Sequence, residues 1–220
     1  PSTTPGAPLV AAWQQVALPD GVRPAALAVA GADLLVGGLA VPDPTPRLLR
    51  LADGGVAAEF TLAPADPNAA VADLVHLTAS GDDVYAIGTM IAGAHANPRL
   101  TVWDGSLASA TLASRPQEFF TFGGHDAGPL LGTVVTGAGP VIVGSRAGAY
   151  GPFGVAWTRS GHTWRQQPSD PVLASTPDRV LGFGGATGTG DRIVVVGDEL
   201  GLAGGLRQRP VVFTGTGSGD

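Results

Sequence analysis

An eight-residue pattern recurs four times along the chain and constrains its fold more than any other feature. Each copy has glycine at both ends, with a mostly apolar run leading into the second glycine. The copies are Gly31–Gly38, Gly81–Gly88, Gly137–Gly144 and Gly190–Gly197. The second glycine returns after 50, 56 and 53 residues. A near-constant period of this size is typical of repeat architectures in which each repeat is one supersecondary unit.

The residues around each copy predict four short strands per repeat. A small or apolar run precedes the first glycine, β-branched residues follow it, and two further runs come after loops or turns. Glycine tolerates a positive φ, so we predict tight hairpin turns at the first glycine of each copy. For the same reason we predict tight turns at Asp53–Gly54, Asp104–Gly105 and Ser160–Gly161. No long segment has helical periodicity.

The repeat therefore predicts an all-β chain folded as a β-propeller with four four-stranded blades. The expected blades cover residues 23–63, 72–113, 129–168 and 180–220. The alternative is a β-sandwich that carries a chance repeat. The blade count allows a closed ring of four, or four blades of a larger propeller completed by another chain.

The N-terminal residues predict a linker followed by a closing strand. Residues 1–10 are rich in Pro, Ser and Thr and are interpreted as a linker. Residues 11–18 contain Trp13 and resemble Thr163–Gln167, the expected outermost strand of the third blade. The last blade ends without a fourth run, so we expect the Trp13 strand to complete it, or to complete a blade from a partner chain. Closure of this kind hides sheet edges that would otherwise recruit other chains.

Composition excludes several classes of function. Hydrophobic residues make up 44 % of the 220 residues, enough for a core, and the net charge is −6, so duplex nucleic acid is not an expected partner. No apolar run is long enough for a membrane span. There is no Cys and no Lys, which excludes disulfides, thiolate metal sites and Schiff-base lysines. Abundant Ala, Gly and Pro with Arg alone as the basic residue indicate a GC-rich, actinobacterial type of coding sequence.

One segment of the third repeat resembles the Asp-box (BNR) motif of bacterial secreted sialidase-like propellers. The segment is Val155–Trp164, in which Gly161, Thr163 and Trp164 match the pattern and Arg159 stands at the Asp position. In that family the box fixes a turn between outer strands and is not the active site. The resemblance implies a propeller fold. It does not imply sialidase activity, because the family's Arg-Ile-Pro signature is absent.

The densest aromatic stretch leads into the most suggestive acid/base pair. Glu118, Phe119, Phe120 and Phe122 precede His125–Asp126 in a long blade-to-blade link. The functional interpretation is an aromatic binding platform beside candidate catalytic groups Glu118, His125 and Asp126. The structural alternative is that the Phe side chains fill a blade interface and His125 caps a turn.

The remaining candidates lie in other loops, and none forms a strong motif. They are the possible catalytic residue Glu199 and the possible binding residues His95, Tyr150, Arg207 and Arg209. His76, on an inner strand, is expected to face the central channel or to be a structural histidine. No two histidines have metal-ligand spacing, so we expect neither a metal nor another cofactor.

Loop lengths favour one rim of the propeller as the binding face. The longer segments are residues 40–46, 89–98, 145–152 and 198–209, with the links 64–72, 113–129 and 168–179. Binding residues concentrate on loops held by a rigid scaffold. The sequence favours an extracellular or cell-envelope binding module for a protein or glycan partner. The alternative is a glycoside hydrolase or lyase on the same rim, which needs two carboxylates about 5–10 Å apart.

Overall fold

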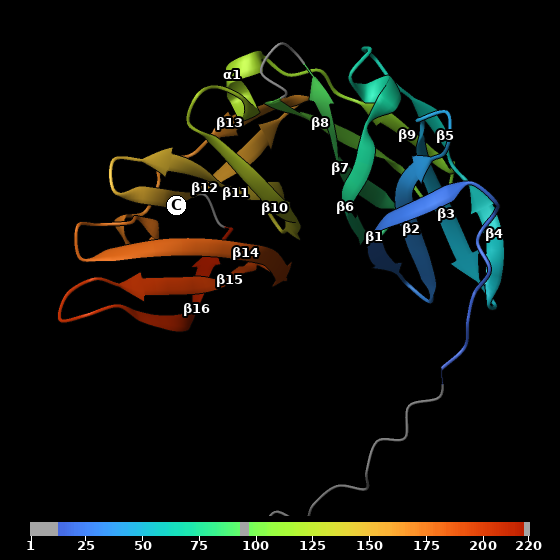
Figure 1. Cartoon of the computed structure of the whole chain (residues 1–220). Helices are drawn as coiled ribbons and strands as arrows, with labels where there is room; N and C mark the ends of the chain where they lie inside the picture. Colours follow the sequence, from blue (N-terminus) through green and yellow to red (C-terminus); the bar gives the residue numbers. More distant parts are fainter. Residues whose placement is uncertain (1–12, 93–96, 218–220) are drawn as a thin grey trace, which may run out of the picture.

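The computed structural model of the chain describes residues 13–92 and 97–217, and it is an all-β structure built from four sheets. Figure 1 shows the sheets arranged as blades around a common centre, with the innermost strand of each blade nearest that centre. The predicted β-propeller is confirmed. The four blades form an arc whose first and last members lie at its two ends (Figure 1).

Each blade is a meander of antiparallel strands that runs outward from the centre. Blade 1 contains β1 (Val22–Ala30), β2 (Asp33–Ala40), β3 (Pro46–Ala52) and β4 (Gly55–Glu59). Blade 2 contains β6 (Asp73–Ser80), β7 (Asp83–Ala92), β8 (Asn97–Ser106) and β9 (Thr111–Ser114), with β5 (Thr61–Ala63) added in parallel to β9. Blade 3 contains β10 (Ala127–Thr136), β11 (Gly139–Gly148), β12 (Gly151–Ser160) and β13 (Thr163–Gln166). Blade 4 contains β14 (Arg179–Thr189), β15 (Arg192–Gly201) and β16 (Arg207–Thr216).

Short helical turns occur only in the links between blades, within the described residues. They are α1 (Phe119–Phe122) and two 3-10 turns, η1 (Ala69–Val71) and η2 (Pro171–Leu173). Because consecutive strands of a blade are antiparallel, these links lie at the same end as the second turn of each blade. That end is the rim predicted to carry function.

Most of the predicted turns are present, and one is misplaced. Asp53 and Gly54 both have positive φ, of 50° and 78°, as a two-residue hairpin turn requires. Asp104–Gly105, predicted as a turn, lies instead within β8, and the turn follows at residues 107–110. The Asp82 carboxylate stabilises that later turn by accepting hydrogen bonds from Ser106 Oγ at 2.6 Å and Ala108 N at 2.6 Å.

On the rim predicted to carry function, some loops are shorter than expected because the flanking strands extend further into them. The predicted loop at residues 145–152 reduces to a two-residue turn, since Gly148 pairs with Gly151 across β11 and β12. The long segments of this rim are therefore the blade-to-blade links and not the loops within blades.

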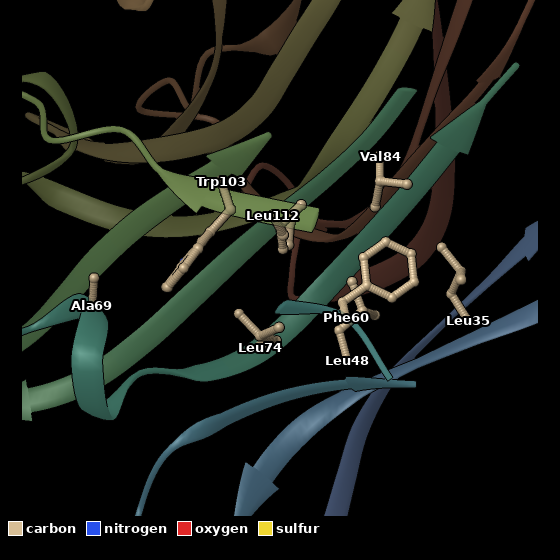
Figure 2. Close-up of a cluster of buried hydrophobic side chains, with 9 residues drawn as sticks. Leu35, Leu48, Phe60, Ala69, Leu74, Val84, Trp103 and Leu112 are labelled. Atoms are coloured by element: carbon tan, nitrogen blue, oxygen red, sulfur yellow. The ribbon is translucent and has the colours of Figure 1, made fainter. Parts of the chain in front are cut away.

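The hydrophobic core lies between blades. One cluster joins blades 1 and 2 and includes Leu35, Leu48, Phe60, Val84 and Trp103, all at most 4 % exposed. Figure 2 shows these side chains converging from strands of both sheets. Equivalent clusters fill the interfaces between blades 2 and 3 and between blades 3 and 4.

The N-terminal segment differs from the expected closing strand. Its described residues, Trp13–Leu18, form no strand. Val16 and Leu18 pack on Leu49 and Leu51 of blade 1, while Trp13 is 93 % exposed. Blade 4, which this segment was expected to complete, lies at the opposite end of the arc (Figure 1), so pairing within one molecule is not formed. Residues 11 and 12 and the predicted linker 1–10 lie outside the described residues.

Candidate functional site

The aromatic stretch Phe119–Phe122 forms a one-turn helix, α1, and its phenylalanines serve different purposes. Phe122 is 5 % exposed and packs edge-on against Trp157, with ring centres 5.4 Å apart. It fills the interface between blades 2 and 3, as the structural interpretation expected. Phe119 and Phe120 are 53 % and 75 % exposed, so they remain available to a ligand.

Arg146 on β11 holds α1 and the residues that follow it in place. Its buried guanidinium donates hydrogen bonds to the carbonyl oxygens of Phe120 at 2.9 Å and Thr121 at 3.1 Å. It also forms an ion pair with Asp126 at 2.8 Å. Trp157 Nε1 donates a further hydrogen bond to Thr121 O at 2.9 Å. The backbone that presents Phe119 is therefore fixed by two side chains of blade 3.

Asp126 belongs to this support and is not placed as an acid or base. Desolvation raises the pKa of Asp126, but a backbone hydrogen bond and the charge of Arg146 outweigh it, so its pKa lies below the ordinary value. A carboxylate held ionised by a buried arginine is a poor proton donor near neutral pH. Its sequence neighbour His125 is exposed and lines a cavity.

Two cavities flank Phe119 on the rim between blades 2 and 3. The first has a volume of about 640 Å³ and the second about 530 Å³. Both are lined by Arg99, Phe119 and Phe122. The guanidinium of Arg99 lies 5.0 Å from the centre of the Phe119 ring, a cation–π distance. We call the two cavities together the Phe119 cleft.

Polar side chains from two different links line the first cavity. Glu118 and Gln117 come from the link between blades 2 and 3, and Asp66 and Asn68 come from the link between blades 1 and 2. Asp66 Oδ1 accepts hydrogen bonds from Asn68 N at 2.9 Å and Ala69 N at 3.0 Å, which stabilise the start of η1. Glu118 is exposed.

His76 and His125 line the second cavity. His76 stands on β6, where desolvation lowers the pKa of its imidazole, opposed by a backbone hydrogen bond to Leu130. Its ring is therefore neutral at pH 7 and offers one donor and one acceptor. His76 thus lies on the inner strand of blade 2, beside Leu130 of blade 3.

The other sequence candidates lie away from the Phe119 cleft. Glu199 is 9 % exposed and forms ion pairs with Arg209 at 2.9 Å and Arg179 at 3.7 Å. Arg207 is exposed at the start of β16, and Tyr150 is exposed in the β11–β12 turn. His95 lies outside the described residues.

Sequence reasoning missed several residues of the cleft, above all Asp66, Arg99 and Arg115. The only available signal was their position in or beside the links of the long-loop rim, since no local motif marks them. No group of three or more potential metal-ligating His, Asp or Glu side chains occurs among residues 13–92 and 97–217. In the same part of the chain, no helix is long and apolar enough to span a membrane.

Comparison with known proteins identifies the fold and not a family. No protein-family model matches the chain, and no curated protein matches it in sequence. Among solved structures, it is similar to a family 117 glycoside hydrolase from Zobellia galactanivorans, with a TM-score of 0.52 and 9 % identity over 89 % of this chain and 66 % of the other. It is also similar to the endosialidase of phage phi92, with a TM-score of 0.51 and 9 % identity over 88 % and 35 %.

A xylan β-1,4-xylosidase from Bacillus halodurans C-125 is a third similar structure, with a TM-score of 0.50 and 10 % identity over 90 % and 41 %. This chain spans between about a third and two thirds of the length of these three proteins. These three neighbours are a glycoside hydrolase, an endosialidase and a xylosidase. At 9–10 % identity the similarity establishes the β-propeller fold alone.

Proposed function

We propose that this chain is a glycan-binding module whose ligand lies in the Phe119 cleft. One observation carries the proposal: an exposed, rigidly supported phenylalanine stands between two cavities lined by amide, carboxylate, imidazole and guanidinium groups. An aromatic face offers apolar contact to the C–H face of a sugar ring, and the polar groups offer hydrogen bonds to its hydroxyls. The module is proposed to work outside the cell or in the cell envelope.

The support of α1 favours binding. Arg146 and Trp157 fix the backbone of α1 before any ligand arrives, so little ordering cost is expected on association. The names of the similar structures also describe proteins that act on glycans, which is an analogy at the level of the fold.

Isothermal titration of the full chain with xylohexaose, cellohexaose and oligosialic acid tests the proposal. We expect one of these probes to bind, and Phe119→Ala to weaken its association constant about tenfold or more, a loss of roughly 1.4 kcal/mol. Phe120→Ala is the matched control, because Phe120 lies on the same helix, is exposed and lines neither cavity. Equal losses in both variants, or binding unaffected by Phe119→Ala, would argue against the cleft.

A glycoside hydrolase is the second candidate, and one observation favours it. Asp66 and Glu118 line the same cavity from different links, and paired carboxylates are the catalytic groups of most glycosidases. The test is release of reducing ends from the same oligosaccharides. Hydrolysis that is abolished by Glu118→Gln and by Asp66→Asn would establish the enzyme. Asn also caps helical turns, so the Asp66 variant is expected to keep η1.

A further inference from the structure

The three interfaces between blades follow one rule of side-chain position. In blades 2 and 3 the residue immediately before the last glycine of the repeat, with its partner on the third strand, packs on the next blade; in blade 1 that residue is Gly37, and its partner Leu48 makes the contact. In blade 2 these are Ile87 and Val102, which are 0 % and 3 % exposed and pack on Ile142 and Trp157 of blade 3. We call this side of a blade its following face, and the opposite side its preceding face.

The following face of blade 4 has apolar residues at the same positions, but no other blade packs on it. Val196 precedes Gly197 and pairs with Val212, as Ile87 precedes Gly88 and pairs with Val102. Yet Val196 is 47 % exposed and Val212 is 64 % exposed. Aliphatic side chains at the positions that pack between blades elsewhere are thus open to solvent here.

The inner part of the preceding face of blade 1 is open in the same way, whereas Val16 and Leu18 pack on the buried Leu49 and Leu51 further out on that face. Leu34 occupies the position that Val84 occupies in blade 2, and it is 43 % exposed whereas Val84 is fully buried. Leu27 and Val29 on β1 are 69 % and 67 % exposed. An apolar groove of about 530 Å³ lies on this face, lined by residues of β1, β2 and β3 together with Val16 and Leu18.

The outer edge of blade 4 also lacks the neighbouring strand that the equivalent edge of blade 3 has. Within the described residues β16 pairs only with β15, whereas β12 of blade 3 pairs through Trp157–Ser160 with β13. The equivalent stretch of β16 is residues 213–216, which contains neither charge nor proline. Arg207, Arg209 and Pro210, residues of the kind that protect sheet edges, lie in the other half of the strand.

We propose that a further β-blade docks between blade 4 and blade 1. Its occupant is one more repeat of this kind, supplied by polypeptide outside these 220 residues, with aliphatic side chains on both faces and an outer strand beside residues 213–216. Both open faces border the single opening of the arc in Figure 1, so an insert there meets both. The contact would continue the interface already formed three times between blades 1, 2, 3 and 4.

A chain extended with its own repeat provides the probe. In this longer chain, residues 1–216 are joined directly to a second copy of residues 161–216. The first part of the copy supplies an outer strand for blade 4, and the remainder supplies another blade. We expect the melting temperature to rise by about 5 °C or more over the 220-residue chain. We also expect amide hydrogen exchange to slow at Phe213–Thr216 and at Leu27–Val29.

A substitution on the open face shows whether the gain arises there. Val212→Glu in the first copy is expected to change little in the 220-residue chain, because Val212 is exposed, and to remove the gain in the extended chain. Leu206→Glu is the matched control, since Leu206 is 76 % exposed but lies in the β15–β16 loop. An extended chain that is insoluble, gains no stability, or keeps its gain with Val212→Glu overturns the proposal.

The 220-residue chain and its Val212→Glu variant also show whether a second copy of the chain, and not a further repeat, covers the open face of blade 4. Light scattering of the 220-residue chain is expected to give the mass of a monomer. A doubled mass that returns to the monomer value with Val212→Glu would mean that a second copy covers this face, and would overturn the proposal of a further repeat.

Discussion

At the scale of single residues, polar side chains in this protein act mainly as supports for the backbone. Asp104 forms ion pairs with Arg115 of blade 2 and Arg159 of blade 3, and so links the two blades. Glu199, Asp126 and Arg146 are similarly committed to ion pairs. Two of the carboxylates that looked available for chemistry in the sequence, Asp126 and Glu199, are therefore bound by structural partners.

Replacing Arg146 by Met should destabilise the fold strongly. The variant leaves the Phe120 carbonyl without its side-chain donor, removes one of the two donors to the Thr121 carbonyl and takes the counter-charge from Asp126, a loss of about 3 kcal/mol in the free energy of unfolding. Urea titration measures it. Arg165→Met is the control, because Arg165 is exposed on β13, and its change should stay within about 0.5 kcal/mol. Equal losses would remove the special role of Arg146.

His76 should make stability fall on mild acidification. Its pKa is lower in the fold than the ordinary 6.5, because burial disfavours the charged ring. Below pH 6.5 the unfolded chain therefore binds more protons than the fold, and stability decreases as the pH falls towards the folded pKa. Melting temperatures between pH 8 and pH 5 should fall less steeply for His76→Gln than for the parent. If the melting temperatures of the parent and of His76→Gln fell equally between pH 8 and pH 5, His76 would not be the group that makes stability depend on pH.

At the scale of strands, a close backbone approach explains the last glycine of three repeats, Gly38, Gly144 and Gly197, while Gly88 is crowded by the side chains of Thr101 and Ala72. The inner strands β1, β6, β10 and β14 each carry a register shift near this glycine. A Cβ at Gly38 would collide with the carbonyl oxygen of Arg23, and one at Gly144 would lie 2.8 Å from Pro129 O. The glycine that marks the repeat in sequence thus makes room for the irregular inner strand.

Gly38→Ala and Gly55→Ala should therefore have opposite effects. At Gly38 the added methyl group meets backbone, which cannot move aside cheaply, and a loss of about 1–3 kcal/mol is expected. At Gly55 an added Cβ meets nothing within 4 Å, and the smaller entropy of the unfolded chain should stabilise the fold by about 0.4–1 kcal/mol. Chemical denaturation of both variants tests the contrast, and a tolerated Gly38→Ala would refute it.

At the scale of the whole molecule, stability depends on the contacts between blades, because the largest buried side chains lie there. Trp103 and Trp157 take equivalent places in consecutive blades, each packing on the blade before it. In blade 1 the equivalent residue is Leu49, and Val16 and Leu18 cover it in place of a preceding blade.

Removing residues 1–18 should lower both the melting temperature and the solubility of the chain. Leu49 and Leu51, now 0 % and 8 % exposed, would lose their cover and enlarge the apolar surface of blade 1. Deletion of residues 1–10 alone, the predicted linker, provides the comparison. Thermal scans and sedimentation of the two deletions measure the effect. If both behave like the parent, the packing of Val16 and Leu18 contributes nothing.

The sequence by itself determined the repeat, the all-β class and the four blades within these residues, because glycine spacing and β-branched runs are local signals with a fixed period. It also marked the Phe119–Phe122 link. It did not distinguish Phe122, which is buried, from Phe119, which is exposed, since both lie in one short aromatic stretch with no periodicity to show which side faces the core. Only the tertiary structure decided that Asp66 and Arg99 line the same cavity as Phe119, and that Asp126 forms an ion pair with Arg146. Those contacts join segments distant in the chain, whose approach depends on how the blades pack.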